Sequence, residues 1–205
     1  MVRLAHGWRL TADAKTAPAL IREFIRPAVR AIPGAMARQV GRCQVRLAAD
    51  LSEARAASKW TATGAGLDIE IATRGREPHD IAMELLLCLG QALWQKLTPD
   101  QFQAYWRLLD AEVRSGVPGE IDEDAFREKR ALLRSASSAS SRSRLERYGR
   151  ASFAGTAAEY VHCLWHEVRL VSGRRRLPPQ PLRRRLNLLS RWFPPARGYR
   201  LYPAA

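Results

Sequence analysis

One stretch of the chain has the spacing of metal ligands. His162 and His166 lie four residues apart, and Glu159 precedes His162 by three. Residues three or four apart share a helix face, so these side chains form a candidate triad for zinc-assisted hydrolysis. The same spacing is common among ordinary surface or hydrogen-bonded histidines, and no partner helix bearing ligands is evident. We therefore predict no bound metal and no cofactor, and keep a metal-dependent hydrolase as an alternative.

A further histidine, His79, directly follows Pro78 at the start of a predicted helix. Its neighbours Glu77 and Asp80 make it a candidate for an ion pair. We interpret it as a residue of the helix start and not as part of a site.

The last third of the chain has the composition of a polyanion-binding surface. Residues 134–205 hold 15 Arg against three Glu, a net charge of +12 out of +14 for the whole chain. Nearby aromatic residues such as Trp192 and Tyr199 add the stacking groups that nucleic acids require. The candidates are two Arg triplets, Arg174, Arg175, Arg176 and Arg183, Arg184, Arg185. A solvated helix face produces the same pattern more often, so nucleic-acid binding is kept as an alternative.

Residues 84–94 read Glu-Leu-Leu-Leu-Cys-Leu-Gly-Gln-Ala-Leu-Trp, which is apolar almost all round and typical of a helix inside a domain. The segment resembles the active helix of small bacterial zincin-like putative metallopeptidases, His-Glu-Leu-Gly-His-Ala-Leu-Trp. In that motif the two His bind zinc and the Glu is the general base. Here Leu87, Cys88 and Gln91 stand at those three positions. The resemblance therefore implies a degenerate motif without the ligands or the base.

A second segment, residues 153–160, resembles the later helix of that family, in which a Glu before a Tyr supplies the third ligand. Glu159 stands at this position, and the resemblance implies that it approaches Leu87 and Gln91. One carboxylate alone holds no zinc. An unrelated α+β domain, in which the first segment is a buried helix packed through Gly90, remains the alternative.

Hydrophobic spacing predicts the elements that position these residues. A first helix is expected over residues 17–32, with Pro27 kinking or dividing it. Alternating apolar residues predict strands at 43–49 and 67–71, with a third at 60–63, and the short connections favour mostly antiparallel pairing. Further helices are predicted over residues 79–97, from Thr98 with Pro99 at its first position, over 122–133, over 151–170, and over a short segment ending near Trp192.

Composition bounds the architecture and the location. A chain of 205 residues with 46% hydrophobic and 26% charged residues suits one globular domain, residues 1–205. The Ser-rich residues 135–144 are expected to form a flexible loop, and residues 174–205 a basic C-terminal segment. The first residues lack the apolar run of a secretory signal, the longest apolar stretch is too short for a membrane span, and three scattered Cys fit a reducing compartment. We predict a cytoplasmic protein without a membrane partner.

Together these features predict an α+β, zincin-like fold, in which a small, mostly antiparallel sheet packs on a central buried helix with several further helices. The leading functional hypothesis is a non-catalytic scaffold that binds a protein or peptide, for example along the sheet edge. Its degenerate zinc-site positions are Leu87, Cys88, Gln91 and Glu159.

Overall fold

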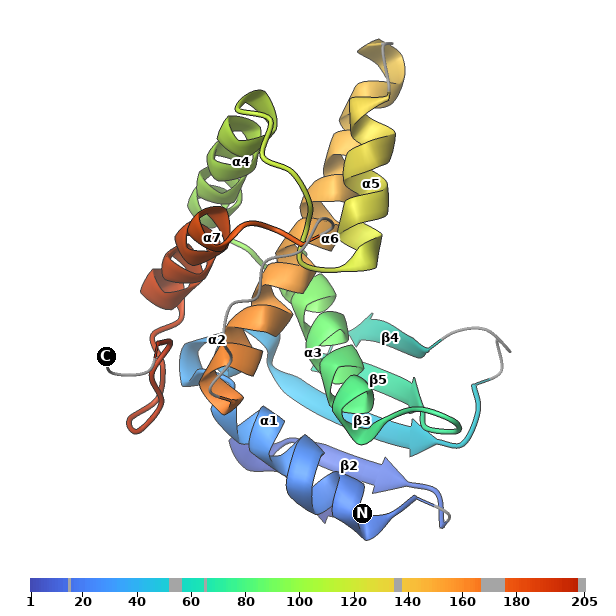
Figure 1. Ribbon diagram of the computed structural model, residues 1–205. Coiled ribbons are helices and arrows are strands. Elements are labelled where there is room, and N and C mark those ends of the chain that lie inside the picture. Colours follow the sequence, from blue (N-terminus) through green and yellow to red (C-terminus); the bar gives the residue numbers. More distant parts are fainter. Residues whose placement is uncertain (15, 52–56, 65, 135–137, 167–175, 203–205) are drawn as a thin grey trace.

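The computed structural model describes all residues except 15, 52–56, 65, 135–137, 167–175 and 203–205 (Figure 1). Within the described residues the fold is α+β, as predicted, with a five-stranded sheet and seven α-helices. None of these helices combines the length and the apolar character that crossing a membrane requires. Arg174 and Arg175 lie outside the described residues.

The sheet is mixed, and the prediction of mostly antiparallel pairing is wrong. Its strands are β1 (Val2–Arg3), β2 (Arg9–Ala12), β3 (Arg42–Ala48), β4 (Ser58–Thr63) and β5 (Gly66–Ala72). They lie in the order β1-β2-β3-β5-β4, in which β2 and β5 are both parallel to β3. Only the outer pairs, β1 with β2 and β4 with β5, are antiparallel.

Two features of the chain produce this topology. The N-terminal strand β2 was not predicted, and helices separate it from β3, which is the kind of connection that parallel neighbours need. The second feature is that β4 does not pair with its predecessor in the sequence. It lies at the edge of the sheet, and β5 returns through the predicted turn to fill the place between β3 and β4.

Helices cover one face of the sheet, and α3 (Pro78–Trp94) contacts both β4 and β5 there. The first predicted helix continues through Pro27, because a π-helical segment, Leu20–Ile25, passes directly into α1 (Arg26–Ala31) with helical backbone angles at the junction. At this junction the N–H of Arg26 donates to Ile21 O, five residues back, and Pro27 follows without a donor of its own. A short helix α2 (Gly34–Val40) then leads into β3.

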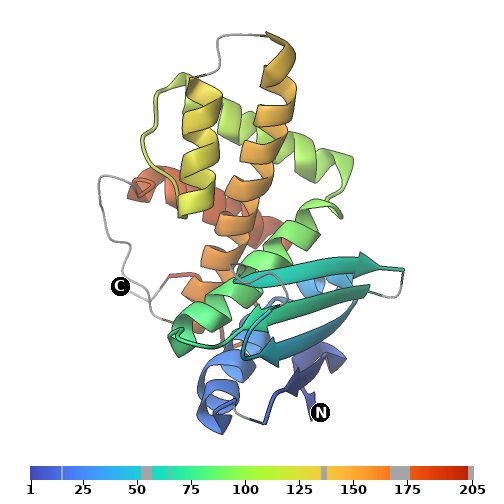
Figure 2. The same cartoon turned by 90° about the vertical axis from the view of Figure 1, so that its right-hand side faces the viewer.

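The remaining helices form a second group on the far side of α3 (Figure 2). They are α4 (Pro99–Arg114), α5 (Glu123–Leu133), α6 (Ser138–Trp165) and α7 (Pro179–Trp192). Thr98 caps α4 as predicted, because its side chain accepts from Gln101 N while the Gln101 side chain accepts from Thr98 N. Helix α6 spans 28 residues and already includes residues 138–144, so this part of the predicted loop is helical instead.

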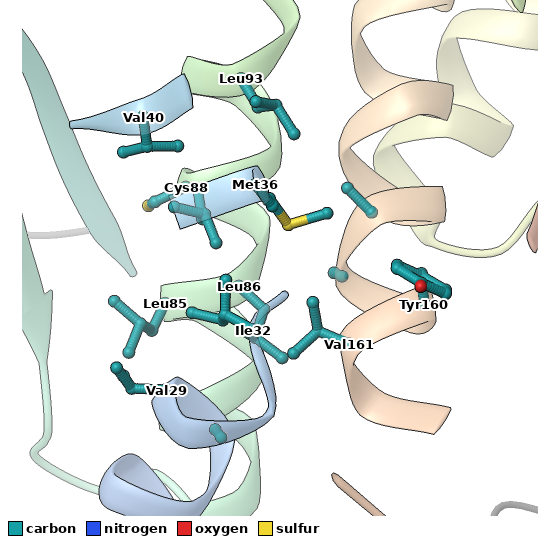
Figure 3. Packing of buried hydrophobic residues seen from close by; sticks show 14 of the residues in the cluster. Val29, Ile32, Met36, Val40, Leu85, Leu86, Cys88, Leu93, Tyr160 and Val161 are labelled. Atoms are coloured by element: carbon teal, nitrogen blue, oxygen red, sulfur yellow. The ribbon is translucent and has the colours of Figure 1, made fainter. Parts of the chain in front are cut away.

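The main core lies where α1, α2, α3 and α6 meet, and Figure 3 shows Ile32, Leu86 and Val161 within it. Helices α3 and α6 pack closely at Gly90, as predicted for a Gly inside a buried helix. A Cβ atom at position 90 would lie only 2.8 Å from both Cα and O of Ala154. This close approach fixes the position along α3 at which α6 crosses it, and so determines which side chains of the two helices are in contact.

Candidate functional site

A cleft of about 720 Å³ lies between the edge strand β4 and helices α3, α5 and α6. Its size falls within the range of ligand-binding clefts in proteins. The residues lining it come from four elements that the fold brings together: Ala57, Ser58, Lys59 and Trp60 around β4; Glu84, Leu87 and Gln91 on α3; Asp122, Glu123, Asp124, Arg127 and Glu128 at α5; and Arg147, Arg150, Ala151 and Ala154 on α6.

The floor of the cleft is one face of α3. Glu84, Leu87 and Gln91 follow each other at intervals of three and four residues, so they form a single stripe on the helix. Two of them are hydrogen-bonded to β4: Ser58 Oγ donates to Glu84 Oε2 at 2.9 Å, and Trp60 Nε1 donates to Gln91 Oε1 at 2.6 Å. These bonds hold the edge strand at the rim of the cleft.

The outer edge of β4 has free backbone groups. Ala57 O accepts from Ala72 N at 3.0 Å, and the register continues through the pair Ser58 and Ile71. Because hydrogen-bonded and non-hydrogen-bonded pairs alternate in an antiparallel ladder, the N–H and C=O groups of Ser58, Trp60 and Ala62 point away from β5. In the described part of the sheet, no strand pairs with this edge.

The opposite walls are charged. The start of α5 contributes acidic residues, whereas α6 contributes Arg147 and Arg150. Asp122 is the N-cap of α5, and its Oδ1 accepts from Ala125 N at 2.9 Å. Its Oδ2 is buried without a hydrogen-bond partner, and burial raises the pKa of the Asp122 carboxyl to about 6.

The degenerate motif divides between two faces of α3. Leu87 and Gln91 both line the cleft, which agrees with the expectation that they point the same way. Cys88 faces the sheet instead, where burial and the nearby Glu84 carboxylate raise the pKa of its thiol to about 12, despite a hydrogen bond with Ser58. A thiol with this pKa remains protonated near neutrality and is inert as a nucleophile.

Glu159 is not among the residues that line the cleft. Its Oε2 lies 3.3 Å from Nδ1 of His162, and its Oε1 lies 3.9 Å from the Cys163 sulfur. The structure therefore places Glu159 beside a histidine and outside the cleft that Leu87 and Gln91 line. The expected convergence of these residues is not seen.

That histidine belongs to a second cluster, where the start of α3 meets the end of α6. His79, His162 and His166 each offer a ring nitrogen, and the three nitrogens lie within 4.8 Å of one another. His79 was assigned to the helix start alone, and it does lie 3.9 Å from Asp80 through Nδ1. Its proximity to His162 depends on how α3 crosses α6, so no local pattern in the sequence reveals it.

The two Arg triplets separate into different environments. Arg176, Arg183 and Arg184 are exposed, as a polyanion-binding surface requires. Arg185 is completely buried and is therefore unavailable to a polyanion, which corrects its inclusion among the candidates. The stripe of α7 that faces inward consists of Leu182, Arg185, Leu186 and Leu189, and this spacing in the sequence was the available sign that Arg185 turns toward the core.

Arg185 is the centre of a buried polar network that joins four helices. Its Nε donates to Glu112 Oε2 at 3.0 Å, and its Nη1 donates to Glu120 Oε2 and to Ser152 Oγ, both at 2.7 Å. Lys129 Nζ lies 3.3 Å from Glu120 Oε1. Burial alone would raise the pKa of Glu120, but Arg185 and Lys129 outweigh it and lower the pKa below its ordinary value.

Comparison with known proteins adds no family. No protein-family model matches the sequence, and neither the curated proteins nor the solved structures contain a match. The functional interpretation therefore depends on the cleft and on the histidine cluster themselves.

Proposed function

We propose that this chain is a non-catalytic scaffold that binds an extended segment of another polypeptide along the outer edge of β4. The observation that carries the proposal is the outward-pointing backbone of Ser58, Trp60 and Ala62, of which the first two residues also line the cleft. An added strand would form main-chain hydrogen bonds with these groups, which is the β-augmentation mode of peptide recognition.

The surroundings of β4 suit an extended polypeptide. Side chains along a strand alternate in direction, so one set would meet the α3 floor around Leu87 while the other would point to solvent. The walls offer both signs of charge, from Glu123 on α5 and from Arg150 on α6. A partner segment with polar side chains of both charges would be complementary to such walls.

The absence of cleavage is also part of the proposal. Among the described residues that line the cleft there is no His and no Cys. Leu87 and Gln91 stand at the positions where the zincin-like peptidases that the segment resembles carry their zinc ligands. An edge strand beside a helix with these two residues supports a zincin-like origin of the cleft. Gln91 has a different use here, because it accepts the hydrogen bond that holds Trp60.

The test uses a phage-displayed library of random linear peptides, followed by calorimetry on synthetic versions of the selected sequences. Ser58→Pro removes an outward N–H without removing a bond to β5, and Ser58→Ala is the control that removes only the hydroxyl. We expect Ser58→Pro to weaken peptide binding by at least tenfold relative to Ser58→Ala, because the proline variant loses one main-chain hydrogen bond to the peptide.

Backbone amide spectra supply the second measurement. Binding should shift the amide signals of Ser58, Trp60 and Ala62 and protect them from exchange. A selected peptide that binds both variants equally and leaves these amides unchanged would show that the edge of β4 is not the binding site. Cleavage of the selected peptides by the purified chain would contradict the non-catalytic part.

A further inference from the structure

Three of the four histidines of the chain gather at one place, at the opposite end of α3 from its contact with α4. His79 is the second residue of α3, whereas His162 lies in the last turn of α6 and His166 directly follows that helix. Nε2 of His79 lies 3.0 Å from Nε2 of His162. None of the three residues lines the cleft, so this site is independent of the proposed peptide binding.

The ring nitrogens have the spacing of a nearly formed metal site. A tetrahedral zinc ion with bonds of about 2.0–2.1 Å to imidazole places its nitrogen ligands about 3.3 Å apart. The observed nitrogens range from a 3.0 Å pair to a limit of 4.8 Å, so small rotations of the rings are enough to converge on one ion. His162 and His166 are one helical turn apart, which directs both rings to the same side.

A carboxylate orients the central ligand. Glu159 Oε2 lies 3.3 Å from Nδ1 of His162, and a proton on Nδ1 that is donated to this carboxylate leaves Nε2, 3.0 Å from Nε2 of His79, free to bind a metal. A carboxylate behind a histidine is the usual outer partner of a metal ligand. Glu159 therefore has a role different from the one that the sequence resemblance implied.

Packing holds the rings while leaving the site accessible. The Trp165 ring stacks on the His79 ring with an interplanar angle of 14° and a distance of 5.8 Å between the ring centroids. The centroid of the His166 ring lies 4.1 Å from that of Trp165. The side chain of His162 is only 15% exposed, whereas the side chain of His79 is 42% exposed. His166 is also exposed to solvent. An ion can therefore enter from solvent and keep a water molecule on its open side.

The surroundings of His166 also favour its neutral imidazole. Burial and the neighbouring His162 and His79 lower the pKa of His166 below its ordinary value. A neutral imidazole has the free lone pair that a metal ion requires, and two imidazolium ions at this distance would repel each other.

We propose that His79, His162 and His166 bind one zinc ion, or a first-row divalent metal of similar preference, with Glu159 as the positioning residue behind His162. Three imidazole ligands with an open fourth position suit this class of ion, because imidazole nitrogen is a preferred ligand of zinc, copper, nickel and cobalt. The ion links the first turn of α3 to the end of α6.

The experiment measures zinc affinity by competition with a chelating dye, using the full chain without a polyhistidine tag. We expect one zinc ion per chain. His79→Asn, His162→Asn and His166→Asn should each lower the affinity by more than tenfold, and Glu159→Gln should lower it about 10- to 100-fold. His6→Asn is the matched control, because His6 lies outside the cluster and Asn tolerates its positive φ of 60°.

Cobalt supplies a measurement that does not depend on variants. The wild-type chain with one equivalent of Co²⁺ should show the strong visible absorption of a tetrahedral ion, and zinc should displace it. Equal zinc affinity in the wild type, the cluster variants and the His6 control would overturn the proposal. So would a cobalt spectrum typical of an octahedral hydrated ion.

Discussion

Replacement of Arg185 by Met is the most demanding test of the buried network. The side chain of Met fills much of the same space, but it removes the positive charge and all donors. Glu112 and Glu120 would then remain buried, and Glu120 would keep only Lys129 as a positive charge beside it and the Tyr148 hydroxyl as a donor. Breaking a buried ion pair by removing one partner costs about 3–5 kcal/mol, because the remaining charge is uncompensated.

This magnitude should be visible in a thermal melt. In a chain of about 200 residues each kcal/mol changes the melting temperature by about 2–4 °C, so Arg185→Met should melt roughly 6–20 °C below the wild type. Arg184→Met is the matched control, because Arg184 is the exposed neighbour on the same helix. Circular dichroism on the three proteins at pH 7 gives the comparison.

The pH dependence of the loss distinguishes electrostatics from packing. The lowered pKa of Glu120 stabilises the wild type at neutral pH, and this stabilisation disappears as the pH falls through that pKa. Without Arg185, burial would raise the pKa of Glu120, so folding would require proton uptake. The difference between the two proteins should therefore be largest near pH 7 and shrink toward pH 4. Equal melting temperatures of Arg185→Met and Arg184→Met, or a difference independent of pH, would refute this reasoning.

Three further outcomes are expected. Gly90→Leu should lower the free energy of unfolding by about 1–3 kcal/mol or more, because its Cβ would meet the Ala154 backbone, and an unchanged melting temperature would contradict the packing. Asp122→Asn should raise the free energy of unfolding by about 1–3 kcal/mol at pH 8 but not at pH 4, as measured by denaturant titration. The reason is that burial raises the pKa of the Asp122 carboxyl to about 6 in the folded chain, so ionisation destabilises the native state as the pH rises through this value. Equal gains at both pH values would argue against burial as the cause. If the chain binds heparin at low salt, Arg183→Ala and Arg184→Ala should each flatten the logarithmic salt slope by about one, and an unchanged slope would exclude this surface.

Local features of the fold were predictable, because they depend on neighbouring residues. Thr98 and Pro99 mark the start of α4, and the alternation of apolar residues marks β3 and β5. The order of the strands was not predictable, since β2 has only four residues and each of them pairs with a residue 35 positions later in the chain. Short strands carry little periodicity, and pairing between distant segments leaves no local pattern.

The candidate sites show the same division. Helical spacing was enough to place Leu87 and Gln91 on one side of α3. The meeting of His79 with His162 spans 83 residues and depends on the crossing of two helices, so the sequence indicated only His162 and His166 at the end of α6. Within the second Arg triplet, only the helical spacing with Leu182, Leu186 and Leu189 distinguishes the buried Arg185 from the exposed Arg183.

The buried network has a consequence for synthesis on the ribosome. Glu112 and Glu120 leave the ribosome long before Arg185, which is carried by α7, the last helix among the described residues. Until that helix emerges, the two carboxylates lack their main counter-charge. The helices around them therefore cannot pack together without burying two negative charges that are not compensated. Nascent chains stalled before residue 185 should therefore remain sensitive to protease in the region of α4 to α6, and release of α7 should complete the fold in one late step.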